Sequence, residues 1–181
     1  MTSYQRIVLA ERPKGPPTLA NFRIEDQPMP TIAEGEFLVR IIWLSLDPYM
    51  RGRMDDGPSY ADPVKLGETM TAGAVGEIVA SRHPRFSEGT IVVGAFGWCS
   101  MAVSTGEGVQ KLDPTQAPLS TALGALGMPG HTAWVGLTRI LQAQPGETAV
   151  ISAASSASKM PSLSVLHTEP SFCENDAPAL S

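Results

Sequence analysis

The segment GETAVISAAS, residues 146–155, has the composition of a turn followed by a short strand buried on both faces. In dinucleotide-binding proteins such a strand leads into a glycine-rich loop, whose backbone amides approach a pyrophosphate closely. Here all 17 glycines of the chain lie at or before Gly146. The segment therefore begins like a phosphate-binding site and lacks the residue type that such a site most needs.

Thiol and imidazole side chains, which could bind a metal, are scattered along the chain. Cys99 and Cys173 are far apart and form no CxxC pair, and the histidines stand singly at positions 83, 131 and 167. This spacing predicts neither a disulfide framework nor a thiolate zinc site. We interpret the histidines as solvent-facing or singly hydrogen-bonded residues and expect no metal.

The composition is that of an ordinary globular protein. The chain has 181 residues, 43% hydrophobic and 17% charged, with a net charge of -5. This length allows one full domain and part of a second. The acidic balance, without a run of Lys or Arg, argues against nucleic acid and membranes as partners. No stretch reaches the ~18 to 20 apolar residues of a membrane span, and the beginning of the chain has no long apolar signal core, so the expected location is cytoplasmic.

Short β-rich runs separated by turns occupy most of residues 1–118. Residues 4–10 and 22–28 read as strands around a Pro- and Gly-containing loop, and residues 36–46 form the longest run, which we expect to be a central strand. Residues 73–80 and 89–98 predict two more strands, whose glycines indicate bulges or barrel corners. The pattern predicts a mostly β fold with some α, built on a small irregular barrel.

After Pro114 the periodicity becomes helical. Four apolar residues have the spacing of one helix face: Leu119, Ala122, Leu123 and Leu126. The sequence GMPG is expected to end that helix. A second helix is expected over residues 131–143, with Thr132 as its N-cap. The buried strand of residues 148–155 is expected to have no neighbour, because a parallel partner would need a crossover of a dozen or more residues. The Ser- and Pro-rich residues 155–181 are expected to be mostly disordered.

Three stretches, taken together and in the same order, resemble one family. WLSLDPYMRGRM (43–54), LGALGMPGHTAWVGL (123–137) and PGETAVISAAS (145–155) are similar to the zinc-independent prostaglandin, curcumin and alkenal double-bond reductases. These enzymes belong to the medium-chain dehydrogenase/reductase superfamily, and the resemblance covers residues 4–155. It implies a GroES-like β-barrel domain (1–118), then the helices and first strand of an incomplete Rossmann domain (119–154), and finally an atypical tail (155–181).

The resemblance also implies a reaction. Members of the family use NADPH to reduce the carbon–carbon double bond of α,β-unsaturated ketones and aldehydes, so we expect NADPH as the cofactor and a small-molecule enone as the substrate. Relatives carry a glycine-containing run after the buried strand, where this chain reads SASKMPSLS (156–164). We therefore expect a truncated or frame-shifted N-terminal portion of such an oxidoreductase, which is not active alone.

On the substrate side, Tyr49 matches a family position that lines the pocket, where a phenol hydrogen-bonds a carbonyl or stacks on an enone. The alternative is a half-buried tyrosine of the barrel. Asp47 and Pro48 are expected to shape the turn that presents Tyr49, and the two arginines of the stretch, Arg51 and Arg53, are interpreted as surface charges. The zinc-dependent branch of the superfamily places a cysteine ligand near SLDPYM, and this sequence has none there.

On the cofactor side, Met128, Gly130 and Thr132 match the stretch MPGxTA, which in the family lies beside the nicotinamide end of the cofactor. The plain alternative is a helix break followed by an N-cap, and the two interpretations are compatible. The sequence departs from its relatives at His131 and Trp134, and both changes could alter the size of the pocket.

Three functions stay open. The chain is a member of the NADPH-dependent enone reductases, whose chemistry belongs to the full-length relative. Alternatively, it is a non-catalytic barrel fragment or interaction module, either as a homo-oligomer or in association with a full-length subunit. The reason is that exposed apolar faces and unpaired strand edges promote association. The third alternative is a quinone-reductase-like member of the same superfamily.

Overall fold

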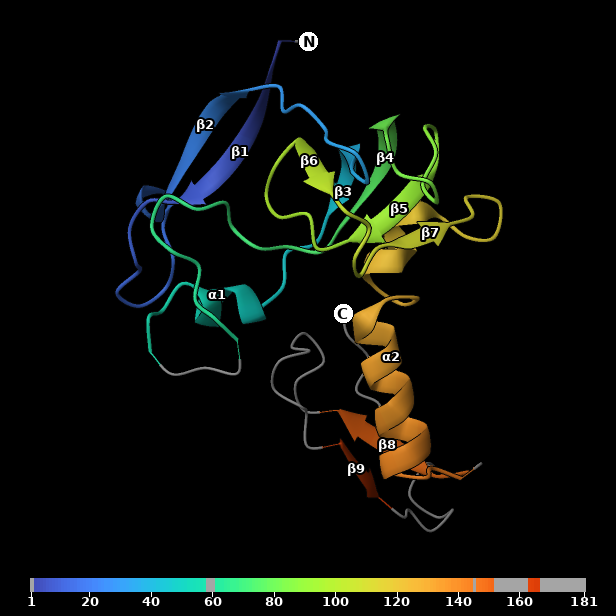
Figure 1. The fold of residues 1–181 in the computed structure, drawn as a ribbon. Coiled ribbons are helices and arrows are strands. Elements are labelled where there is room, and N and C mark those ends of the chain that lie inside the picture. The colour runs from blue at the N-terminus through green and yellow to red at the C-terminus, as the bar shows by residue number, and fades with distance from the viewer. Residues whose placement is uncertain (1, 58–60, 145, 152–162, 167–181) are drawn as a thin grey trace, which may run out of the picture. The chain divides into compact units, whose positions relative to one another are not determined.

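The computed structural model describes residues 2–57, 61–144, 146–151 and 163–166 (Figure 1). The chain divides into two compact units, residues 1–130 and 131–181. Strands β1 to β7 belong to the first unit and strands β8 and β9 to the second. The predicted domain boundary after residue 118 stays a prediction, because the division between units falls within helix α2 (Met128–Val135).

An antiparallel sheet with the strand order β6-β3-β4-β5-β7 dominates the first unit (Figure 1). Its strands are β3 (Phe37–Leu44), β4 (Ala74–Ser81), β5 (Ile91–Gly94), β6 (Met101–Ser104) and β7 (Gln110–Leu112). Strand β3 has a neighbour on each side, so the expected central strand is confirmed. One core cluster packs on this sheet, and it consists of four strand residues and one residue from the loop between β4 and β5: Phe37, Val39, Ile78, Val92 and Phe86.

The strand expected over residues 89–98 is shorter in the structure, because β5 ends at Gly94. After Gly94 the chain leaves β4 and bonds to the segment that precedes β4. The amide of Gly97 donates to the carbonyl of Ala72 at 3.1 Å, and that of Trp98 donates to the carbonyl of Met70 at 2.8 Å. Strands β6 and β7, which the sequence analysis did not single out, complete the two edges of the sheet.

A two-stranded hairpin precedes this sheet, formed by β1 (Ser3–Leu9) and β2 (Phe22–Pro28). Both strands were predicted, and the loop between them ends in the 3-10 helix η1 (Leu19–Asn21). On its other edge β1 bonds to two loop segments: the amide of Ile7 donates to the carbonyl of Trp98 at 2.8 Å, and that of Met70 to the carbonyl of Ile7 at 3.0 Å. The hairpin is thereby joined to the body of the first unit.

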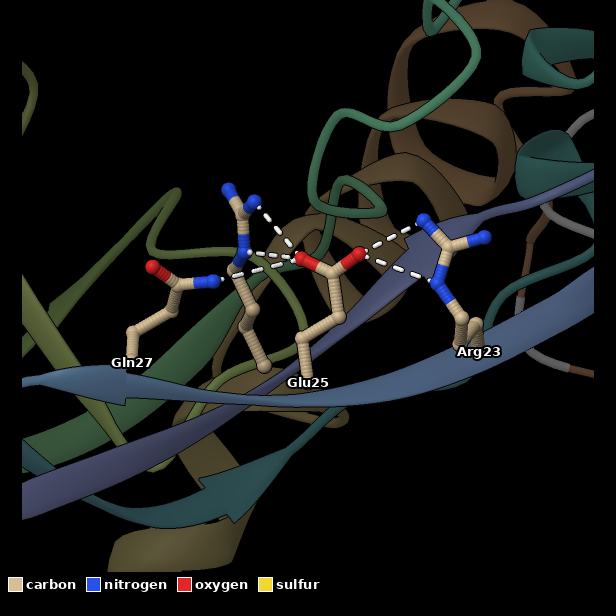
Figure 2. Close-up of polar contacts among 4 residues, drawn as sticks. Arg23, Glu25 and Gln27 are labelled. Carbon is tan, nitrogen blue, oxygen red and sulfur yellow. Dashed lines mark hydrogen bonds and ion pairs between the residues drawn. The ribbon is translucent and has the colours of Figure 1, made fainter.

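One carboxylate organises the polar face of the hairpin (Figure 2). Glu25 lies opposite Arg6 in the strand register, and it accepts hydrogen bonds from Arg6 Nη2 at 2.8 Å and from Arg23 Nη2 at 2.6 Å. The Nε atoms of both arginines also donate to this carboxylate, and Gln27 Nε2 adds a further hydrogen bond at 3.3 Å. The hydrogen bonds from Arg23, and then those from Arg6, hold the pKa of Glu25 below its usual range.

The helices that follow differ from the sequence prediction. Residues 119–123 form the short 3-10 helix η2 (Leu119–Leu123), and Leu126 lies outside it with 70% of its surface exposed. Helix α2 begins within GMPG, where the prediction had a helix end, since proline is well tolerated in the first turn of a helix. Thr132 is therefore inside α2, and the expected N-cap at Thr132 is wrong. Helix η3 (Gly136–Ile140), a single π-helical stretch, continues α2.

The second unit also contains a strand pair. Strand β8 (Thr148–Ile151) pairs antiparallel with β9 (Leu163–Leu166). The expectation that this strand has no neighbour is wrong, because the tail itself supplies one. Residues 152–162 and 167–181, where most of the expected disorder falls, lie outside the described residues.

The predicted fold class is confirmed, since strands predominate and the helices are short. Within the described residues, no helix combines the length and the apolar character that crossing a membrane requires.

Candidate functional site

The predicted substrate side begins where β3 ends. The amide of Ser45 donates to the carbonyl oxygen of Gly73 at 2.9 Å, which keeps the chain beside the start of β4. The Ser45 hydroxyl donates to Asp47 Oδ2 at 2.7 Å, and the amide of Met50 donates to the carbonyl of Asp47 at 3.1 Å. These bonds form the turn from which the helix α1 (Tyr49–Arg53) begins, with Pro48 at its N-cap position.

Tyr49 is the first residue of α1 and is half-buried. It packs against a second core cluster of the first unit, which consists of Leu9, Met50, Met54, Val64, Met70 and Ala72. Met50 and Met54 are one helical turn apart and anchor α1 to this cluster, so the orientation of Tyr49 depends on the packing of its neighbours. The turn that was expected to present Tyr49 is present, and the contact of its phenol with a substrate stays a prediction.

Arg51 supports the loop that precedes β2. Its Nε donates to the carbonyl of Gly15 at 3.0 Å, and its Nη1 pairs with Asp55 Oδ1 at 2.7 Å. Arg51 therefore connects α1 to the loop between β1 and β2, which is more than the surface charge expected from the sequence.

Arg53 also differs from the expected surface charge. The residue is half-buried, and its Nε atom is shielded from solvent without a hydrogen-bond partner among the described residues. Such an atom is uncommon in a folded protein. No local pattern indicates this burial, because the burial of a guanidinium depends on the packing of segments distant in sequence.

The predicted cofactor residues are carried by α2. Met128 is its first residue, with 52% of its surface exposed, and Thr132 follows one turn later. Gly130 allows a close approach of the backbone: a Cβ at this position would overlap the carbonyl group of Ala125. The amide of Gly130 donates to the carbonyl of Gly124 at 3.1 Å, which tightens the entry into α2.

The two positions that are predicted to depart from the relatives are exposed. His131 and Trp134 follow Gly130 on α2, and Trp134 has 54% of its surface accessible. The guanidinium of Arg139 lies 5.9 Å from the centre of the Trp134 ring, within the range of a cation–π contact. An effect of either residue on a pocket stays a prediction.

A separate cavity of about 230 Å³ lies between β7, the turn that follows it and η2. Lys111, Asp113 and Gln116 supply its polar wall, and Leu119 and Leu126 are among its apolar lining residues. Hydrogen bonds from the hydroxyl and the amide of Thr115, and from Gln116, hold the pKa of Asp113 below its usual range. None of the predicted substrate- or cofactor-binding residues lines this cavity.

Metal and thiol chemistry find little support in the described part of the chain. There, no three side chains from among His, Cys, Asp and Glu come together as metal ligands would. The Cys99 thiol donates to the carbonyl of Phe96 at 3.3 Å, and burial raises its pKa to about 11. Cys99 is thus a neutral, weakly nucleophilic thiol at pH 7, whereas Cys173 and His167 lie outside the described residues.

Known proteins match this chain over most of its length. Residues 5–112 match the family model of the N-terminal domain of oxidoreductase. The chain is 49% identical over 151 residues to the NADPH-dependent curcumin reductase of Escherichia coli (strain K12), a match that covers 83% of this chain and 44% of that protein. It is 40% identical over 147 residues to prostaglandin reductase 1 of Rattus norvegicus, covering 80% of this chain and 43% of that protein.

Solved structures agree with these matches. The crystal structure of CurA in complex with NADPH from Vibrio vulnificus superposes with a TM-score of 0.74 at 46% identity, over 79% of this chain and 42% of that one. The present chain thus spans less than half the length of each of these three relatives.

Proposed function

The chain belongs to the zinc-independent enone reductase family of the medium-chain dehydrogenases/reductases, and we propose that it is the substrate-side portion of such an enzyme. In the complete enzyme the reaction would be reduction of the carbon–carbon double bond of an α,β-unsaturated ketone or aldehyde. The chain alone would not carry out this reaction. The names of the relatives, which refer to curcumin and prostaglandin, support a small-molecule substrate.

The observation that carries the proposal is the anchored start of α1. Ser45 and Asp47 form the turn, and Met50 in α1 and Met54 directly after it are buried in the core, so Tyr49 is held at the edge of that core. A phenol in this position can donate a hydrogen bond to a substrate carbonyl oxygen and pack its ring on the conjugated system. In this role Tyr49 would orient the enone. Reduction of its double bond would additionally require a hydride donor.

NADPH would supply the hydride for this reaction, and Met128, Gly130 and Thr132 are the residues that would adjoin its nicotinamide end. The exposure of Met128 and the close backbone packing at Gly130 are compatible with that role. The residues that follow β8 do not fit the pyrophosphate of the same cofactor, so we derive no reaction step through it.

A chimera tests the proposal. Residues 1–151 of this chain would be joined to the part of the Escherichia coli curcumin reductase that follows its corresponding strand. We expect the chimera to oxidise NADPH in the presence of benzalacetone, an enone, and to be inactive with benzylacetone, its saturated analogue. Tyr49→Phe should lower kcat/KM by about tenfold, whereas Tyr4→Phe on β1 should leave it unchanged. A folded chimera without activity would refute the proposal.

The second candidate function is a non-catalytic interaction module. Apolar side chains at the end of β3 favour it, because Trp43 is 50% and Leu46 is 72% exposed. A homo-oligomer and association with a full-length subunit, a quinone-reductase-like activity and a cytoplasmic location all stay predictions. Static light scattering of the purified chain separates an associating module from a monomeric one.

A further inference from the structure

We infer that this polypeptide does not hold the pyrophosphate of NADPH, because a β-hairpin stands where the family function requires a phosphate-binding strand–loop–helix unit. The inference rests on the proposed function, since that function is what requires NADPH. It concerns the residues directly after β8 and is independent of how far the chain extends beyond them.

A dinucleotide site of the Rossmann type has two physical requirements at its first strand. The loop after the strand needs glycines, because a Cβ would prevent the backbone amides from approaching the pyrophosphate oxygens. A helix must then begin at the same point, so that its free N–H groups and the positive end of its dipole face the phosphates. Both features lie at the carboxyl end of the strand.

The last glycine of this chain is at the other end of the strand. Gly146 has a φ of +93°, and the amide of the next residue, Glu147, donates to the carbonyl of Gln144 at 3.2 Å, so Gly146 forms the turn that enters β8. The sequence that follows β8 is SAASSASKMPS (152–162), which contains no glycine. It also contains Pro161, which lacks an N–H group to offer to a phosphate.

The direction of the next element gives an independent argument. Thr148 pairs with Leu166 and Ile151 pairs with Leu163, so β8 and β9 run antiparallel. A parallel neighbour would have required a crossover of about a dozen residues or more, usually through a helix. In the described part of the second unit, the chain after β8 therefore returns as a strand.

The charges near β8 do not compensate for the missing unit. Lys159 is the only basic residue within 146–166. One lysine supplies a single point charge, whereas a diphosphate is normally bound by several backbone amides at once. The inference therefore distinguishes this chain from the relatives that are named for NADPH, even though residues 5–112 match the N-terminal domain of oxidoreductase.

Titration with NADPH tests the inference on the complete 181-residue chain. Nicotinamide fluorescence and isothermal titration calorimetry should show no saturation up to about 1 mM NADPH. The Escherichia coli curcumin reductase, titrated in the same buffer, serves as the positive control. Saturable binding by this chain at micromolar NADPH would overturn the inference, and circular dichroism would show that the chain is folded in the sample.

Paired cysteines test the hairpin itself. Val150 and Ser164 are directly opposite in the register, so the double variant Val150→Cys/Ser164→Cys should form a disulfide under mild oxidation. The matched control is Val150→Cys/Val165→Cys, because successive residues of a strand alternate between its faces. Both pairs would be placed in a Cys99→Ser/Cys173→Ser background. Equal or preferential cross-linking of the control pair would contradict the hairpin.

The two proposals fail in different ways. The chimera takes its phosphate-binding loop from the relative, so an inactive chimera counts against the substrate-side function and leaves the inference about β8 intact. NADPH binding by the native chain overturns the inference alone, and it would strengthen the proposed function.

Discussion

Ser45 and Gly73 are joined by a backbone hydrogen bond of 2.9 Å, at the point where the chain leaves β3 and turns towards α1. Gly73 also adjoins η2, since a Cβ at this position would lie 3.6 Å from Leu123 Cδ2. Two of the segments that carry the family resemblance, one containing Tyr49 and the other containing Leu123, therefore meet beside the first residues of β4. The position of α1 depends on this junction.

The first prediction concerns Ser45 as a positioning residue. Ser45→Ala removes the hydroxyl bond to Asp47 at 2.7 Å and keeps the backbone bond to Gly73. We expect a loss of about 1 kcal/mol in the free energy of unfolding. In the chimera we also expect a higher KM for benzalacetone with little change in kcat, because the turn before Tyr49 is loosened.

Ser104→Ala is the matched control for Ser45→Ala. The Ser104 hydroxyl accepts a hydrogen bond from the amide of Gly106 at 3.0 Å, at the end of β6. Ser104→Ala should lower the free energy of unfolding by a similar amount and leave KM for benzalacetone unchanged. Equal effects of the two variants on KM would mean that Ser45 has only a structural role.

The second prediction concerns the close contact between β3 and β4. Gly76 lies opposite Ile41 in the register, and a Cβ on it would overlap Val39 Cγ1 and the carbonyl oxygen of Arg40. Gly76→Ala should therefore destabilise the first unit by about 1–3 kcal/mol, as overpacking does in a tight core. Urea unfolding followed by circular dichroism measures this change.

Gly52→Ala provides the contrast within the same unit. Gly52 is in α1 and has no neighbouring atom within 4 Å of the added Cβ, so alanine should stabilise the protein slightly, by about 0.5–1 kcal/mol. If Gly76→Ala proved as harmless as Gly52→Ala, the packing between β3 and β4 would have to be looser than the structure indicates.

The third prediction concerns acid stability. Because hydrogen bonds from Arg23 and Arg6 lower the pKa of Glu25 in the folded state, its carboxylate stabilises the fold above the unfolded-state pKa, and this contribution is lost as the pH falls through the folded-state pKa. Glu25→Gln should therefore be less stable than the native chain at pH 7, with a difference that shrinks below about pH 4. Melting temperatures measured as a function of pH test this.

Asp113→Asn is a companion variant at a distant site. Its carboxylate also has a lowered pKa, owing to hydrogen bonds from Thr115 and Gln116. Its effect should have the same sign and pH dependence, and the double variant should be additive, since the two sites share no partner. A stability difference for Glu25→Gln that stays constant from pH 7 to about pH 3 would contradict the assigned cause.

The alternation and β-branched content of the sequence were sufficient to predict the core strands. The runs that became β1, β2, β3 and β4 are each close to the observed bounds, because β-branched and aromatic residues on a half-buried surface give a strong local signal. The short strands β6 and β7 gave no comparable signal, since each depends on its neighbour in the sheet.

The site segments show what local reasoning misses. GMPG was interpreted as a helix end, whereas Met128 and Pro129 open α2, because glycine and proline mark both ends of helices. The buried Nε of Arg53 and the pairing of β8 with β9 depend on contacts between separate segments, so neither could be predicted from a local pattern. The roles of Tyr49, Met128, Gly130 and Thr132 remain predictions from the family.

The last prediction concerns self-association through the end of β3. Strand β6 pairs only with residues 37–40 of β3, so the opposite edge of residues 42–44 has no strand partner among the described residues. Trp43 and Leu46 add exposed apolar surface there, at 50% and 72% exposure. Exposed strand edges and apolar patches promote association, so we expect the purified chain to form homo-oligomers in a concentration-dependent manner.

The variant Trp43→Ser/Leu46→Ser should shift this equilibrium towards the monomer, as measured by multi-angle light scattering over a range of protein concentrations. Leu19→Ser is the control, because Leu19 is 92% exposed in η1 and belongs to a different part of the unit. It should leave the apparent mass unchanged. A native chain that stays monomeric at every concentration, or an equal response to both variants, would show that the end of β3 is not an association surface.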